Sequence, residues 1–72
     1  MSTPISVLDV VALLAAAPEH GLVRGQVGTV VEKLGDCSCE VEFCDDSGRT
    51  YAIVPFSSEL LLVLHHRPIR AA

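Results

Sequence analysis

Apolar and polar residues alternate in two neighbouring segments near the middle of the chain. The first, C-E-V-E-F-C at 39–44, changes character at every step, and R-T-Y-A-I-V at 49–54 follows it and ends at Pro55. A period of two places successive side chains on opposite faces of a strand. The pattern predicts a β-hairpin, with D-D-S-G at 45–48 as its connecting turn.

The length of this turn decides which residues face each other across the hairpin. A three-residue loop that ends with Gly48 in the left-handed conformation pairs Phe43 with Tyr51 and Val41 with Ile53. These four large side chains then share one face. A four-residue loop would instead place a threonine and an alanine opposite the same two residues. We therefore predict the three-residue loop.

The segments around the hairpin also have the features of short strands and turns. Positions 26–34 are rich in Val and Thr and end at Gly35-Asp36, which predicts a strand. Positions 56–59, F-S-S-E, suit a single helical turn, and positions 60–64 suit a last short strand. Short strands joined by tight turns are typical of the all-β class and predict a small, strongly bent five-stranded barrel.

The first segment, I-S-V-L-D-V-V-A-L-L-A-A-A at 5–17, has an ambiguous pattern. Apolar residues between Val7 and Leu14 fit a helical stripe, and three successive alanines favour a helix. Val-rich runs favour a strand. The residue pattern leaves both interpretations open, and Pro18 ends the segment in either case.

Seventy-two residues, half of them apolar, suit one small domain near the lower size limit for a single hydrophobic core. We expect a single domain over 1–72, with an ordered core at about 7–64 and a frayed tail at 65–72. A domain of this size buries only about 60–65% of its unfolded surface. Some apolar surface is therefore expected to face a protein partner or a second copy in a homodimer.

The net charge is −4, from nine acidic and five basic residues. Nucleic-acid binders usually present a basic stripe, so this balance argues against DNA, RNA or anionic lipid and favours a partner with a basic surface. The apolar stretch at 7–17 is too short to cross a bilayer, and no basic residue precedes it as in a secretory signal. An odd number of cysteines, three, fits a reducing cytoplasm.

The stretch G-L-V-R-G-Q-V-G-T-V-V-E at 21–32 raises the question of a phosphate-binding loop. A Walker-type loop requires a lysine before Thr29, and a dinucleotide fingerprint ending at Gly28 requires glycine at Val23 and a helix afterwards. A KH-type G-x-x-G clamp joins two helices, whereas a Val-rich strand follows here. We therefore predict that Gly25 makes a turn and that Gly28 is a bulge or a close backbone approach.

Five side chains are of types that bind zinc: Cys37, Cys39, Cys44, His65 and His66. The C-x-C-x4-C spacing is not that of a zinc knuckle, and cysteines at the two ends of a strand at 39–44 point to opposite faces. We expect no metal and no cofactor, with Cys39 in the core and Cys44 on the outer face. Nothing fixes the mutual geometry of Cys37 and His65 for nucleophilic catalysis, so the chain is not expected to be an enzyme.

The acidic residues near the hairpin are the main candidates for binding. On its first strand Glu40 and Glu42 share the face opposite the apolar residues, and Asp45 and Asp46 lie at the adjoining turn. Such a patch suits a basic partner surface by charge complementarity. Three residues in the long loop after Pro18 are candidates for shape-specific contact: His20, Leu22 and Arg24.

Three stretches resemble a family of short, uncharacterised bacterial proteins: L-D-V-V-A-L-L at 8–14, P-E-H-G-L-V-R-G-Q-V-G-T-V-V-E at 18–32, and E-V-E-F-C-D-D-S-G-R-T-Y-A at 40–52. The resemblance covers roughly residues 8–64, and its G-L-V-x-G-x-x-G-T-V-V segment is fairly specific. The wider similarity is to SH3-like barrels, including the KOW-type ones, in which a G-x-x-G-T-V turn leads into a strand. It implies a strand in the first segment, within an SH3-like barrel that has one helical turn before its last strand.

The resemblance brings no catalytic residues. By analogy with small members of the family, it implies a non-enzymatic protein-interaction module that acts as an antitoxin, an inhibitor or a stabilising subunit of a separately encoded protein. The alternative that it implies is a KOW-like nucleic-acid-binding module, using Arg24 and Gln26 at the turn. The net charge argues against this alternative.

Overall fold

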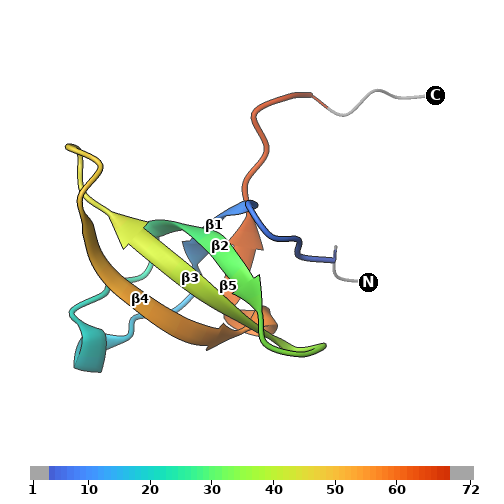
Figure 1. Cartoon of the computed structure of the whole chain (residues 1–72), viewed down its shortest axis with the longest axis horizontal. Coiled ribbons are helices and arrows are strands. Elements are labelled where there is room, and N and C mark those ends of the chain that lie inside the picture. The colour runs from blue at the N-terminus through green and yellow to red at the C-terminus, as the bar shows by residue number, and fades with distance from the viewer. Residues whose placement is uncertain (1–3, 69–72) are drawn as a thin grey trace.

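The computed structural model describes residues 4–68, which form one antiparallel sheet of five strands with two short 3-10 turns. The strands and turns, labelled as in Figure 1, are β1 (Val10–Leu13), η1 (Pro18–His20), β2 (Val27–Lys33), β3 (Ser38–Cys44), β4 (Thr50–Ser57), η2 (Ser58–Leu60) and β5 (Leu61–Val63). Strands β1 to β4 form a meander, and β5 returns to pair with β1, which gives the order β4-β3-β2-β1-β5. The all-β prediction is confirmed.

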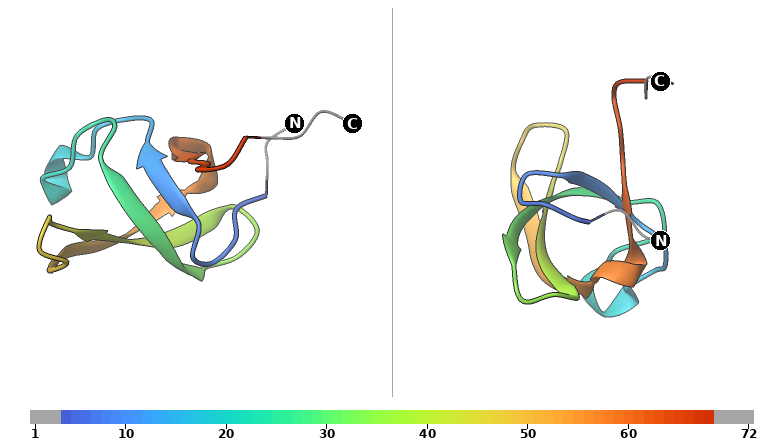
Figure 2. Two further views of the ribbon diagram at one scale, coloured as in Figure 1. Left: turned by 90° about the horizontal axis from the view of Figure 1, so that it is seen from above. Right: turned by 90° about the vertical axis from the view of Figure 1, so that its right-hand side faces the viewer.

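The sheet is strongly curled, with its core on the concave side (Figure 2). Two extra residues sharpen this curl, because a bulge bends its strand and increases the local twist. One is Val31 of β2, between the pairs Val30–Val41 and Glu32–Glu40. The other is Tyr51 of β4, between the pairs Phe43–Ala52 and Cys44–Thr50. Within residues 4–68 no ladder joins β4 to β5, so the sheet is open between these two edge strands.

The core combines inward-facing residues of all five strands with three residues from outside them: Ile5, Ala17 and Leu22. Alternation along β3 buries Cys39, Val41 and Phe43 completely. The Phe43 ring meets that of Phe56 edge to face, with ring centroids 6.1 Å apart, an arrangement that aromatic pairs prefer. The prediction that Cys39 fills the core is confirmed, and Cys44 is exposed, as predicted.

Gly28 is the inward-facing position of β2 next to the largest core side chain. A Cβ at this position would lie 2.6 Å from Cγ1 of Val41, 2.8 Å from the backbone oxygen of Glu42 and 2.9 Å from Cδ2 of Phe43. The Val41 side chain, the β3 backbone and the Phe43 ring therefore occupy the space that a side chain would need. The predicted close backbone approach is confirmed, and Gly25, with φ +90°, makes the predicted turn.

The segment before β1 folds back over the end of the sheet. The Ser6 N–H donates to the Asp9 carboxylate (2.9 Å) and the Asp9 N–H donates to the Ser6 carbonyl (3.1 Å), which closes a tight turn. This reversal brings Ile5 into the core, where its side chain is buried. The Lys33 ammonium donates to the Ile5 carbonyl (2.8 Å) and holds the segment against β2.

The loop of the β3–β4 hairpin has the predicted length. The Asp45 N–H donates to the Arg49 carbonyl over 2.9 Å, which leaves three residues between them. The last of these, Gly48, has φ +82°, the left-handed conformation that this loop type requires. The local turn prediction is confirmed.

Beyond the loop, the predicted pairs Phe43–Tyr51 and Val41–Ile53 are wrong. Tyr51 is an extra residue in β4, so Phe43 pairs with Ala52 and every later residue of the strand moves by one position. A shift of one residue exchanges the two faces of a strand. The turn type determines the register beside the loop, but a bulge two residues away changes it for the rest of the strand.

The register shift improves the core. Val41 pairs with Val54, and Val54 and Phe56 are buried, whereas Ile53 is 52% exposed. Without the bulge, Ile53 would face inward and Phe56 would face solvent. Burial of the larger phenylalanine against Phe43 is a physical reason for this arrangement.

The expected end of this strand at Pro55 is also wrong, since β4 continues past it. The Ser58 N–H donates to the Cys37 carbonyl (2.8 Å), so this pair is hydrogen-bonded. Hydrogen-bonded and non-bonded pairs alternate along an antiparallel ladder. The backbone groups of Val54 therefore point to β3, and those of Ile53 and Pro55 point to the open edge. Proline has no N–H, and at this outward-pointing position no hydrogen bond to β3 is lost.

The remaining element predictions hold with small changes of boundary. The first segment is a strand over Val10–Leu13, as the family resemblance implied, and the strand predicted at 26–34 is β2. The helical turn expected at 56–59 is η2, which begins two residues later. Of the tail expected at 65–72, residues 65–68 are exposed and in neither strand nor helix, and 69–72 lie outside the described residues.

We predict that Gly28→Ala lowers the free energy of unfolding by about 1–3 kcal/mol, because overpacking forces a shift of the β3 backbone or of the Phe43 ring. Urea unfolding followed by circular dichroism measures this loss. The matched control is Gly48→Ala, where a Cβ meets no atom within 4 Å and only the left-handed backbone is strained, at a cost of about 1 kcal/mol. Equal stability of Gly28→Ala and the unmodified chain would contradict the role given to Gly28.

Candidate binding surface

Two of the predicted acidic residues lie on the outer face of the sheet. Glu40 and Glu42 are half-buried, on the opposite face of β3 from its core residues, as predicted. Glu40 lies beside Glu32 of β2, and Glu42 lies beside Thr29. The Thr50 hydroxyl donates to Oε2 of Glu42 (2.6 Å), which orients that carboxylate along the surface. We call Glu32, Glu40 and Glu42 the acidic strip, which lies on the outer face of the β2–β3 half of the sheet.

The two aspartates of the hairpin loop have different environments. Oδ1 of Asp45 accepts the N–H groups of Ser47 (2.9 Å) and Arg49 (3.0 Å), so this carboxylate stabilises the turn itself. Asp46 is exposed at the tip of the loop. Of the two, Asp46 is free to contact a partner, whereas Asp45 stabilises the loop.

The long loop after Pro18 places its candidate residues in opposite directions. His20 and Arg24 are exposed. Leu22 is only 1% exposed, because reciprocal backbone hydrogen bonds between Ala17 and Leu22 (2.9 and 3.1 Å) fold the loop and turn this side chain into the core. Leu22 therefore does not contribute to the surface that was expected of it.

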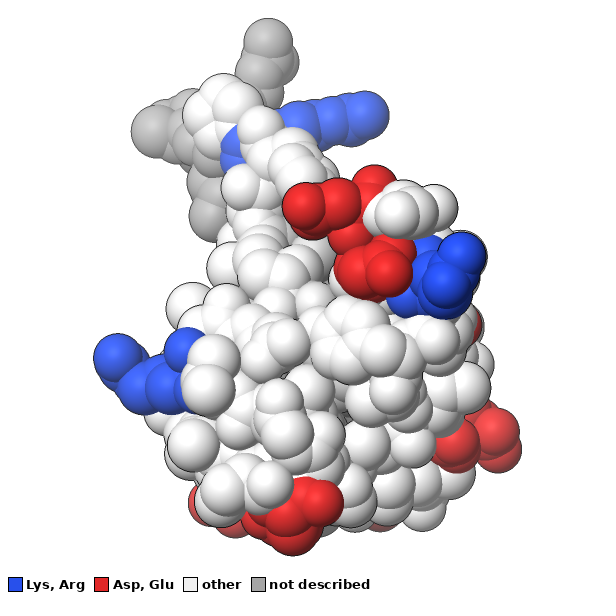
Figure 3. Space-filling view, turned by 90° about the vertical axis from the view of Figure 1, so that its left-hand side faces the viewer, with Lys and Arg blue, Asp and Glu red and all other residues white. Residues whose placement is uncertain are grey.

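The loop at 18–26 and the hairpin loop lie at the same end of the molecule (Figures 1 and 2). Seen from that side, the surface is mostly uncharged, with charged side chains at its margins (Figure 3). Val23 and Tyr51 are both exposed here. Gln26 joins them, because its amide nitrogen donates to the Tyr51 hydroxyl and its carbonyl accepts the Val23 N–H. Polar contacts through Gln26 thus connect the two loops at this end of the molecule, and no cluster of basic residues lies there among the residues described.

The largest unexpected feature is an apolar stripe on the outer face of β1 and β5. Leu13 and Leu61 point into the core, so their neighbours point outward. The ladder continues beyond the strands, because the Leu14 N–H donates to the Leu60 carbonyl (2.8 Å) and the Leu64 N–H to the Val10 carbonyl (2.9 Å). We call three cross-strand pairs the outer apolar stripe: Val10–Leu64, Ala12–Leu62 and Leu14–Leu60.

This stripe is a substantial exposed surface. Leu62 is 50% exposed, Leu14 41% and Leu60 39%, and Val27 of β2, which pairs with Ala12, is 47% exposed. Neither β1 nor β5 contains a charged residue. Along the sheet the stripe meets the acidic strip through the row Val10–Thr29–Glu42. An apolar area bordered by polar residues is typical of an interaction site.

A signal for the stripe was present in the sequence. The segments V-V-A-L at 10–13 and L-L-V-L at 61–64 are apolar at every position rather than at every second one. In a half-buried strand such a run places apolar side chains on both faces. The pairing of these two segments, which makes one continuous patch from them, became visible only in the structure.

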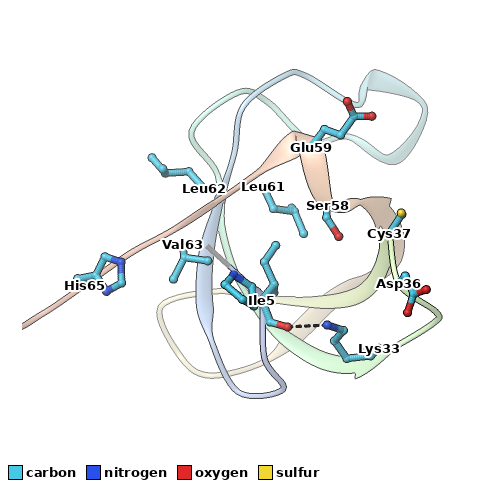
Figure 4. A pocket seen from close by; sticks show the side chains of 11 residues that line it. Ile5, Lys33, Asp36, Cys37, Ser58, Glu59, Leu61, Leu62, Val63 and His65 are labelled. Carbon is cyan, nitrogen blue, oxygen red and sulfur yellow. Dashed lines mark hydrogen bonds between the residues drawn. The ribbon is translucent and has the colours of Figure 1, made fainter. Parts of the chain in front are cut away.

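A groove of about 890 Å³ lies at the other end of the molecule, between the N-terminal segment, the β2–β3 turn, η2 and β5 (Figure 4). Ile5, Lys33, Cys37 and His65 are among the residues that line it. Cys37 and His65 lie on opposite sides of the groove, with Ile5 between them (Figure 4). The groove therefore does not bring this thiol and this imidazole together as a nucleophile and base.

The cysteine and histidine side chains show no metal-binding arrangement in the described part of the chain. Across residues 4–68, no three His, Cys, Asp or Glu side chains are grouped so that they could hold an ion. All three cysteines are unpaired. None of the helical segments described is long and apolar enough to cross a membrane.

Fold and surface together define a small all-β protein with an apolar outer stripe and an adjacent acidic strip. The chain belongs to the family described as a domain of unknown function, DUF4926, whose family model matches residues 7–63. No curated protein and no solved structure matches the chain significantly. The expected membership of an uncharacterised family is thus confirmed.

We predict that Asp45→Ala destabilises the fold by about 1 kcal/mol, because the N–H groups of Ser47 and Arg49 lose their acceptor. Asp46→Ala removes the same charge from the same loop and is expected to change stability by less than about 0.5 kcal/mol. Urea unfolding of the two variants measures the difference. Equal effects would show that the side-chain hydrogen bonds of Asp45 do not stabilise the turn.

Proposed function

We propose that this chain is a non-enzymatic protein-interaction module and that the outer apolar stripe is its main contact surface. The observation that carries this proposal is the row of three apolar cross-strand pairs on the outer face of β1 and β5. Exposed leucines on paired strands present a continuous apolar surface that another protein can cover without rearrangement. Because these leucines are 39–50% exposed, covering one contributes about half of the 1.5–3 kcal/mol that full burial of a leucine yields.

The adjacent acidic strip determines the chemistry of the partner. Glu42 and Glu40 lie on the same outer face, on the β3 side of the stripe. A complementary surface has an apolar centre and Lys or Arg residues on one side. The acidic strip repels nucleic acid and anionic lipid, and therefore favours a protein partner. Asp46, His20 and Arg24 at the loop end are available for peripheral contacts.

The finer assignment is part of the same proposal. The strand order, with a 3-10 turn before a last strand that pairs with the first, supports a partly open SH3-like barrel. Such a small binding module acts as an antitoxin, an inhibitor or a stabilising subunit of a separately encoded protein. Three unpaired thiols support a reducing, cytoplasmic location.

We predict that Leu62→Glu weakens partner binding by at least about tenfold, because it places a charge in the centre of the apolar contact. The tagged chain is expressed in its source organism, and the captured protein is identified by mass spectrometry and then titrated as a purified protein. The variant is expected to fold normally, since Leu62 is half exposed.

Leu34→Glu is the matched control, because Leu34 is 45% exposed but lies in the β2–β3 turn, outside the stripe. It should bind the partner as the unmodified chain does. A partner that binds the Leu62 variant as tightly as the control would contradict the proposed surface. Saturable binding of RNA at low salt would favour the nucleic-acid module instead.

Reversing Glu40 and Glu42 to Lys should slow association with the same partner by about tenfold or more at low salt, because steering between opposite charges is lost. The difference should shrink as salt rises, since exposed charges are screened. Stopped-flow association rates at several ionic strengths measure this effect. Unchanged rates at low salt would remove the acidic strip from the proposed interface.

A further inference from the structure

We propose that the open edge of β4 pairs, antiparallel, with β4 of a second copy, with Ile53 of one chain opposite Ile53 of the other. This proposal concerns a different surface from the outer apolar stripe and does not depend on it. It arises from the one long strand whose outer edge has no partner in the sheet.

The backbone of β4 presents free hydrogen-bonding groups. Since Val54 and Phe56 point their N–H and C=O groups to β3, the corresponding groups of Ile53 point away from the sheet. Among residues 4–68, no backbone hydrogen bond joins this outer edge to another segment. Unpaired edge groups are a template for strand addition. In the proposed pair, the two Ile53 residues exchange their N–H and C=O groups.

The side chains of β4 suit a second copy of the same strand. The sequence T-Y-A-I-V-P-F-S contains no charged residue, so no like charges face each other across the new pair of strands. Antiparallel pairing about Ile53 places the two exposed isoleucines opposite each other and Tyr51 opposite Pro55. Aromatic and branched side chains at facing positions stabilise such pairs. The strand is therefore complementary to itself, as a two-fold interface requires.

The acidic strip does not prevent this pairing. Glu42 lies opposite Ile53 on β3, one strand away from the edge. In the dimer the two Glu42 residues would be three strand spacings apart, about 14 Å. This separation exceeds the screening length of about 10 Å at moderate salt, so their repulsion is small. The other edge strand, β5, has only three residues and offers a shorter template.

Two features of β4 limit the strength of the contact. Pro55 has no N–H to offer at its outward position, and the bulge at Tyr51 interrupts the regular edge. The continuous part of the edge is therefore centred on Ile53. We infer a reversible dimer that forms in the upper micromolar to millimolar range, in which the two outer apolar stripes belong to one extended sheet.

The decisive variant is Ile53→Pro, which removes the outward N–H and leaves the ladder to β3 intact, as Pro55 does two residues later. Sedimentation equilibrium up to millimolar concentration should show the unmodified chain approaching twice its mass of 7.7 kDa, and the variant remaining a monomer. Ile53→Lys, which sets two like charges opposite each other, tests the same contact if the proline variant fails to fold.

Two further variants separate this contact from other modes of self-association. Pro55→Val restores an outward N–H and should strengthen the dimer severalfold. Leu62→Glu, on the outer apolar stripe, should leave it unchanged. The exchange rate of the Ile53 amide, measured by NMR at low and high concentration, should fall at least severalfold as the dimer forms.

A chain that stays monomeric at millimolar concentration would overturn the proposal, as would a dimer that Ile53→Pro and Ile53→Lys preserve. A dimer that Leu62→Glu abolishes would assign self-association to the outer apolar stripe and also overturn it. Loss of partner binding in Leu62→Glu bears only on the proposed function, so the two proposals fail independently.

Discussion

The close approach of β3 to β2 at Gly28 is the constraint on which this fold depends. Phe43 is completely buried, and its ring lies where a β2 side chain would otherwise be. A small domain without tryptophan has few large side chains with which to fill its core. Placing one phenylalanine over a glycine allows the sheet to curl around it, and Phe56 then closes the space from β4.

The curl of the sheet explains the surfaces that are left exposed. One of every two residues of each strand points to the concave side. The other apolar residues of β1 and β5 therefore face outward. The edge of β4 stays open because no ladder within residues 4–68 closes the sheet onto β5. The outer apolar stripe and the open edge are consequences of the same geometry, in which a small core cannot cover all the apolar residues of its chain.

Much of the local structure was predictable, and the candidate surface was predictable only in part. The acidic side chains on the outer face of β3 follow from a strict alternation, and the structure confirms their position. Leu22 shows the limit of such reasoning, since a loop position indicates exposure but the bridge between Ala17 and Leu22 turns the side chain inward. The stripe was missed because its two strands are about fifty residues apart in the chain.

By itself, the sequence determined the strand segments from residue 26 onward and the length of the hairpin loop, because these depend on local periodicity and on backbone sterics in the turn. It left open whether Gly28 is a bulge or a close backbone approach, which the packing of Val41 and Phe43 against β2 decided. Only the tertiary structure decided which face of β4 is buried and which apolar residues remain outside. The bulge at Tyr51 reverses the faces of the strand, and Phe56 gains burial against Phe43 as a result. Such a choice depends on contacts between strands, and neighbouring residues along the chain do not contain that information.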